Sequence, residues 1–130
     1  MPMDADSRQI IRRVLNGLDQ TFIENSDFRI PISQTLWDKG IYYKIPDLVN
    51  FKFQIYFSQP DGQRELRQKI VEELQSKYGG SYENNDAQSY LTIYLPDDNS
   101  IRIDGNEKRI LDIIKKQIEI SKPILLSLPR

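Results

Sequence analysis

Cysteine and histidine are both missing from this chain of 130 residues. Their absence excludes disulfide bonds, thiolate catalysis, Ser-His or Cys-His dyads, and zinc sites built on sulfur or nitrogen ligands. Long apolar runs are missing too, because the longest, Ile124 to Leu128, is far shorter than the roughly 20 residues of a membrane span. The start, Met1 to Asp4, has no basic segment followed by an apolar core, so no signal peptide is predicted. We therefore expect a cytoplasmic protein with no membrane partner.

A charge excess of either sign is also lacking, since 18 Lys and Arg stand against 19 Asp and Glu. The formal net charge of -1 does not supply the long-range positive field of a general nucleic-acid binder, although it leaves room for a local basic patch. Charged residues make up 28% and hydrophobic residues 38% of the chain, as in an ordinary globular domain. The length predicts one domain, 1–130, that can bury its own core.

Hydrophobic periodicity predicts alternating groups of helices and strands. Apolar residues at helical spacing predict helices over about 7–24, 64–78 and 106–122. Strict alternation makes Phe51–Phe57 the clearest strand, with Phe51, Phe53, Ile55 and Phe57 on one side. Weaker strand patterns cover 28–32, 41–45, 81–84, 91–95 and 101–103.

The strands indicate the fold class, because each has one apolar face and one mixed face. Such strands favour an antiparallel or mixed twisted sheet, here of four to six strands, with helices packed on one face only. The predicted fold is therefore α+β, and Trp37 is expected to close one end of the core. The predicted core consists of Ile11, Leu15, Leu18, Phe22, Phe51, Phe53, Ile55, Phe57, Leu66, Ile70, Leu74, Leu91, Ile93, Leu95, Ile101, Ile103, Ile110, Ile113, Ile114 and Ile118.

The opposite face of the sheet is the main candidate for a binding site. Tyr rings offer rigid contact area for a protein partner, and they also stack on bases while cations neutralise phosphates. The alternative is that Tyr and Thr are simply good strand formers on a hydrated face. The residues that alternation places there are Tyr42, Lys44, Lys52, Gln54, Tyr56, Tyr90, Thr92, Tyr94 and Arg102.

The apolar tail, within 123–130, is the second candidate. Pro123 is expected to break or kink the last helix, and Ile124, Leu125, Leu126 and Leu128 follow it. This segment either folds back onto the core or docks on another subunit or domain.

Catalytic and metal-binding patterns are weak in this sequence. Residues 97–104 resemble a calcium loop, but Arg102 occupies the place of the required glycine. Pro46-Asp47 could open a nuclease motif, yet the strand after it lacks the second carboxylate and a suitably placed Lys. Arg8, Arg12 and Arg13 form a basic edge, either a solvated helix face or a strip of phosphate contacts. We therefore predict no enzyme activity, catalytic residue, metal or cofactor.

Two resemblances follow from the element order. The chain has a Trp-x-x-Gly-x-Tyr spacing at Trp37, Gly40 and Tyr42, and a strand, a helix, a strand pair and a closing helix follow it. This arrangement resembles an uncharacterised domain family found C-terminally in prokaryotic restriction-nuclease-like proteins. That resemblance implies an accessory domain of a DNA-processing or defence system. The order, size and acidity are also similar to those of type III secretion chaperones, which implies a dimer that binds an extended effector segment.

The function expected from the sequence is a non-catalytic protein-interaction or oligomerisation module. A protein partner or self-association as a homo-oligomer would use the Tyr- and Lys-rich sheet face and the tail. A nucleic-acid-binding accessory domain and a chaperone-like dimer are the alternatives.

Overall fold

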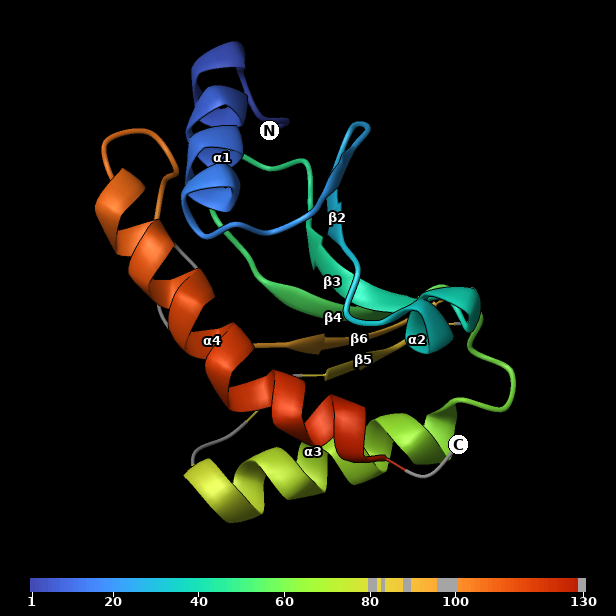
Figure 1. Ribbon diagram of the computed structural model, residues 1–130. Helices are drawn as coiled ribbons and strands as arrows, with labels where there is room; N and C mark the ends of the chain where they lie inside the picture. Colours follow the sequence, from blue (N-terminus) through green and yellow to red (C-terminus); the bar gives the residue numbers. More distant parts are fainter. Residues whose placement is uncertain (80–81, 83, 88–89, 96–100, 129–130) are drawn as a thin grey trace.

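The computed structural model describes residues 1–79, 82, 84–87, 90–95 and 101–128. Helices and strands alternate along the chain (Figure 1). In order they are α1 (Ala5–Gly17), β1 (Ile23–Glu24), β2 (Phe28–Ile30), α2 (Gln34–Asp38), β3 (Ile41–Ile45), β4 (Gln54–Phe57), α3 (Arg64–Tyr78), β5 (Asn84–Asp86), β6 (Leu91–Tyr94) and α4 (Glu107–Ser127).

The strands form one antiparallel sheet of six strands in the order β1-β2-β3-β4-β6-β5. Its centre is β3, β4 and β6, where Tyr43 pairs with Ile55 and Ile55 with Ile93. The predicted α+β class with a twisted open sheet is confirmed (Figure 1).

Three helices, α1, α3 and α4, cover one side of the sheet (Figure 1). We call this side the inner face. Phe51, Phe53, Ile55 and Phe57 all point to it and are buried. The predicted phase is therefore confirmed, although β4 itself begins at Gln54 and not at Phe51. Tyr43 joins the layers, because its hydroxyl lies 2.6 Å from the Ser121 hydroxyl of α4. Of the predicted core, Leu18, Phe22, Leu66 and Ile101 pack at the margin and are only partly buried.

The first helix is shorter than predicted. It starts after Asp4, whose carboxylate accepts the Ser7 N–H at 2.7 Å, and it ends at Gly17. Asp19 then takes a positive φ of 55°, which reverses the chain. The prediction of a helix to residue 24 was wrong because Phe22 repeats the helical spacing while packing on the core from a loop.

The last helix is longer than predicted, because α4 continues through Pro123 to Ser127. A proline removes one helical hydrogen bond, to the carbonyl four residues earlier. Here that carbonyl belongs to Glu119, and both Glu119 and Pro123 are exposed, so water can reach the unpaired group. Burial of Ile124 and Leu125 on the next turn stabilises the continuation. In the described ranges, no helix is long and apolar enough to cross a membrane.

Smaller differences concern the connections. Residues 81 and 83 of the strand predicted at 81–84 lie outside the described residues, and β5 is at Asn84–Asp86. In the described chain, residues 101–103 form an isolated bridge between Asn50 and Arg102. Residues 97–100 of the segment compared with a calcium loop lie outside the described residues. The short helix α2 was not predicted; the Ser33 hydroxyl caps it by accepting the Leu36 N–H at 3.2 Å.

Candidate binding face of the sheet

The side of the sheet opposite the helices carries most of the predicted binding residues. We call it the outer face and define it as Tyr42, Lys44, Lys52, Gln54, Tyr56, Tyr90, Thr92 and Tyr94. Strand pairing arranges it in two rows. Lys44, Gln54 and Tyr94 are opposite one another across β3, β4 and β6, and Tyr42, Tyr56 and Thr92 form the next row.

Aromatic rings run across the outer face in a continuous series. The Trp37 and Tyr42 ring centroids are 5.2 Å apart, those of Tyr42 and Tyr56 5.5 Å, and those of Tyr56 and Tyr90 5.5 Å. The last pair is stacked, with an angle of 17° between ring planes. These spacings are those of favourable ring contacts, so the rings hold one another in place, and α2 supplies the Trp37 ring at one end of the series.

Cations lie over several tyrosine rings of the outer face. The Lys44 ammonium is 4.1 Å from the Tyr56 ring centroid, and the Lys52 ammonium is 5.2 Å from that of Tyr94. Both distances suit cation–π attraction. At the edge, Arg29 lies 5.4 Å from the Tyr42 centroid.

One buried carboxylate supports this edge of the face. Asp27 accepts a hydrogen bond from Arg29 at 3.1 Å and lies 3.5 Å from the Lys44 ammonium. The single negative charge of Asp27 thus faces two positive charges. Together, Asp27, Arg29 and Lys44 carry a net charge of one positive unit.

Part of the outer face is hollowed to a volume of about 300 Å³. Of the described residues that line the hollow, none is acidic. They are Lys44, Pro46, Leu48, Lys52, Gln54, Tyr56, Tyr90, Thr92 and Tyr94.

Two polar side chains at the hollow are almost fully buried. Thr92 is 1% exposed, and its hydroxyl has no hydrogen-bond partner. Gln54 is 6% exposed. Buried hydroxyl groups are normally hydrogen-bonded in folded proteins. The Thr92 hydroxyl is an exception to this rule, and it lies beside the hollow.

Burial also affects the tyrosine hydroxyls. It raises the pKa of Tyr42, against an opposing effect of the Arg29 charge. Burial, followed by the neighbouring Tyr90, raises the pKa of Tyr56. Both phenols therefore stay protonated near neutral pH and can donate hydrogen bonds.

Not every predicted residue is placed as expected. Tyr42 is on the outer face but only 4% exposed, because Trp37 and Tyr56 pack against it. Arg102 is exposed but does not line the hollow. It lies near Asp4, whose pKa is lowered by the Ser7 backbone N–H, by the Ser7 side chain and also by the charge of Arg102.

The predicted tail surface is mostly inside the protein. Ile124 and Leu125 are each 2% exposed and belong to the core. Leu126 is exposed and Leu128 half-buried. The fold-back alternative is therefore correct for Ile124 and Leu125, but not for Leu126.

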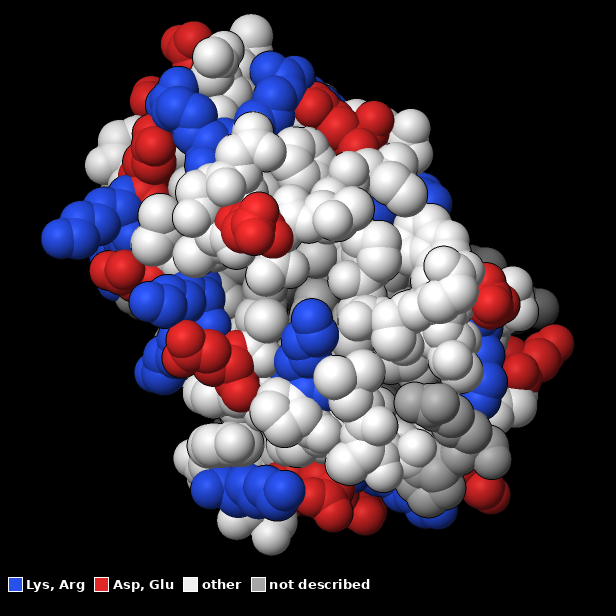
Figure 2. Space-filling model, viewed as in Figure 1, with Lys and Arg blue, Asp and Glu red and all other residues white. Residues whose placement is uncertain are grey.

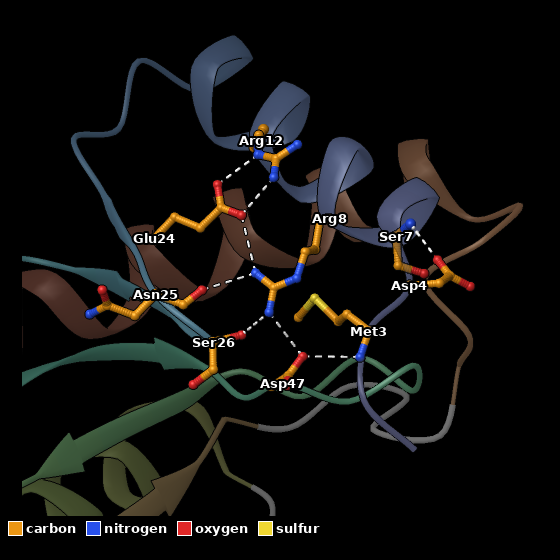
Figure 3. Close-up of polar contacts among 9 residues, drawn as sticks. All are labelled: Met3, Asp4, Ser7, Arg8, Arg12, Glu24, Asn25, Ser26 and Asp47. Atoms are coloured by element: carbon orange, nitrogen blue, oxygen red, sulfur yellow. Dashed lines mark hydrogen bonds and ion pairs between the residues drawn. The ribbon is translucent and has the colours of Figure 1, made fainter.

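The basic edge of α1 is occupied by carboxylates (Figure 3). Arg8 binds Glu24 and Asp47, each at 3.1 Å, and donates to the backbone carbonyls of Asn25 and Ser26. Arg12 binds both oxygens of Glu24, at 2.6 and 2.7 Å.

A third ion pair extends along the same helix, since Arg13 lies 2.6 Å from Glu107. All three arginines of this edge therefore have carboxylate partners, which argues against the strip of phosphate contacts. Seen from the direction of Figure 2, basic and acidic side chains are interspersed rather than gathered by sign.

Sequence reasoning placed Trp37 at one end of the core rather than beside Tyr42, and it missed Asp27. Trp37 reaches Tyr42 because the chain turns at Gly40, which has a φ of 75° and no room for a Cβ beside the Ser58 hydroxyl. The Trp-x-x-Gly-x-Tyr spacing is the sequence signal of this turn. Asp27 gave no signal, because only pairing of β2 with β3 brings it to Lys44.

Comparisons with known proteins do not assign a function to the outer face. No family model, curated protein or solved structure matches the chain. The resemblances to the restriction-nuclease-associated domain and to secretion chaperones therefore stay predictions. Within the described part of the chain, acidic side chains form no group of three or more that could hold a metal ion.

Proposed function

We propose that this protein is a non-catalytic binding module that recognises a segment of a partner protein on its outer face. The observation that carries the proposal is the hollow of about 300 Å³ between half-buried tyrosines and two lysines. Rings that already stack on one another lose little conformational freedom on binding, so they form a favourable contact surface. An accessory role in a prokaryotic DNA-processing or defence system stays a prediction.

Nucleic acid is the second candidate occupant, because Tyr56 and Tyr90 could stack on bases. Binding of a nucleic-acid backbone needs a track of cations along it. Among the described residues, the hollow offers only Lys44 and Lys52 as cations, and Lys44 already faces Asp27. A protein segment fits this short cationic site better.

The proposal is tested by selecting a displayed random-peptide library on the immobilised protein. Selected peptides should bind the wild type and lose at least about tenfold in affinity for Tyr90→Ala, since an aromatic anchor carries much of such binding. Tyr78→Ala is the matched control, because Tyr78 is 49% exposed at the end of α3. Failure to enrich any binder, or equal losses in both variants, contradicts the proposal.

A second copy of the chain is the other protein occupant. Sedimentation equilibrium of the wild type and of Tyr94→Ala distinguishes self-association from binding of a different protein. A dimer that Tyr94→Ala dissociates would show that the outer face joins two copies, and a monomer that binds the selected peptides supports a different partner.

A further inference from the structure

We propose that the hollow in the outer face binds a carboxylate, presented by a Glu or Asp side chain of an acidic partner segment. This inference rests on the proposed function and narrows it to one chemistry. Three observations carry it: the sign of the charges, the unpaired Thr92 hydroxyl and the position of the Gln54 amide.

The charges around the hollow are positive. Lys44 and Lys52 line it, and no acidic residue does in the part of the chain that the structure describes. In the described chain, no carboxylate forms an ion pair with Lys52, whose ammonium instead lies 5.2 Å from the Tyr94 ring. Lys44 shares Asp27 with Arg29. The site therefore keeps positive charge that an incoming carboxylate would neutralise.

The donors lie close together because of the strand register. Thr92 is opposite Tyr56, and Gln54 is opposite both Lys44 and Tyr94. The Thr92 hydroxyl is buried and unpaired, which is unfavourable unless an acceptor arrives. A carboxylate has two acceptor oxygens. One can accept from the Gln54 amide while the other faces the Lys52 ammonium, and rotation of the Thr92 side chain would bring its buried hydroxyl to the same acceptor.

The remaining walls suit a peptide. Pro46, Leu48 and the Tyr90 ring offer apolar surface next to the cations. The methylene groups of a Glu side chain can pack there while its charged end reaches the donors. A phosphate backbone would form fewer ion pairs with this protein. The arginines clustered on α1 already form ion pairs with Glu24, Asp47 and Glu107.

The test uses N-acetylated hexaglutamate as the probe, with hexaglutamine and a hexathymidylate oligonucleotide for comparison. Nitrogen-15 NMR follows the side-chain amide of Gln54, which is in the hollow. Hexaglutamate should shift this amide saturably, and hexaglutamine should not. Equal effects of both peptides overturn the inference. Tighter binding of the oligonucleotide, with a steep dependence on salt, assigns the face to nucleic acid instead.

Two variants separate recognition from folding. Lys52→Gln should weaken hexaglutamate binding about tenfold, as expected for loss of a charge-assisted contact. Lys115→Gln removes an equal charge from an exposed position on α4 and should leave binding unchanged. Equal affinities of wild type and Lys52→Gln contradict the inference.

Thr92→Val gives the sharpest readout, because its two effects have opposite signs. The near-isosteric side chain removes an unpaired buried hydroxyl, so the urea midpoint should rise. Hexaglutamate affinity should fall about fivefold, because the ligand loses a donor. A purely structural role of Thr92 would lower stability and binding together, which would overturn the inference.

Failure of this inference is distinguishable from failure of the proposed function. If library peptides depend on Tyr90 but carry no acidic residues and tolerate Lys52→Gln, the outer face is a binding surface for a different chemistry. If no peptide depends on Tyr90, both proposals fail.

Discussion

The two faces of β3, β4 and β6 are built from alternate residues of the same strands. They differ in how deeply their side chains are buried and in whether their buried hydroxyl groups are hydrogen-bonded. On the inner face Tyr43, Ile55 and Ile93 are at most 1% exposed. The Tyr43 hydroxyl is paired with Ser121. On the outer face Tyr56 and Tyr94 are half-buried, and the Thr92 hydroxyl is unpaired.

The comparison separates residues that stabilise the fold from residues left available for binding. Tyr43 and Tyr56 are the same amino acid on neighbouring strands. The first is sealed between the sheet and α4, and the second stacks on Tyr90 beside an open hollow. The following predictions test whether substitutions on the two faces have correspondingly different effects.

The largest expected effect is on the inner face. Phe53 is 1% exposed and stacks on Tyr43 at 5.1 Å between ring centroids. Phe53→Ala should lower the free energy of unfolding by about 3–5 kcal/mol, because it removes buried area and leaves a cavity. Urea denaturation measures this change. A loss below about 1 kcal/mol would show that the inner face is not the tightly packed side.

The hydrogen bond between β3 and α4 should have the next largest effect. Ser121→Ala leaves the Tyr43 hydroxyl buried without its partner, so a loss of about 1–3 kcal/mol is expected. Adding Tyr43→Phe should recover part of it, because the unpaired group is then gone. A double-mutant cycle by urea denaturation tests this coupling. Strictly additive losses would contradict it.

Acid should weaken the edge where β1 meets α1. Hydrogen bonds from Arg12 and then Arg8 lower the pKa of Glu24 from its ordinary value of 4.5. This stabilisation is present above that value and is lost as the pH falls through the lower pKa of the folded state. Glu24→Gln should cost about 1 kcal/mol at pH 7, as for a partly exposed ion pair.

The loss caused by Glu24→Gln should be smaller at pH 3 than at pH 7, because pH 3 lies below the ordinary pKa of 4.5 and the stabilisation gained by charged Glu24 falls there. Urea midpoints at the two pH values measure it. The same loss at both pH values would show that charge on Glu24 does not matter.

The smallest effect on stability is expected on the outer face. Tyr90→Ala removes a stacked ring at a half-buried position, so the loss should be no more than about 1.5 kcal/mol. Binding of the selected peptides should nevertheless fall sharply. If Tyr90→Ala destabilises the protein as much as Phe53→Ala does, the outer face contributes to the fold like the inner one, and the contrast disappears.

Alternation was enough to assign residues to the two faces. The period of two in Phe51–Phe57 places its apolar side under the helices, and the same phase puts Lys52 and Tyr56 on the other side. It could not show that Tyr42 is buried, because that depends on Trp37 being brought back by the turn at Gly40.

Local sequence rules failed where tertiary packing decided the outcome. Pro123 is a helix breaker by its chemistry, yet burial of Ile124 and Leu125 keeps α4 intact. Phe22 fits the helical pattern of α1 but follows its end. The hollow and the unpaired Thr92 hydroxyl depend on three strands at once, so no segment of the sequence contains a signal for them.

The claim that the outer face is the recognition surface is tested most directly by titrating a selected peptide against protein carrying carbon-13-labelled tyrosine. Tyr43 is the internal control, since it lies on the inner face of the same sheet. The account predicts that ring signals of Tyr56, Tyr90 and Tyr94 shift with the peptide while those of Tyr43 and Tyr78 stay in place. Shifts confined to Tyr78, at the end of α3, would place binding on the helices and contradict it.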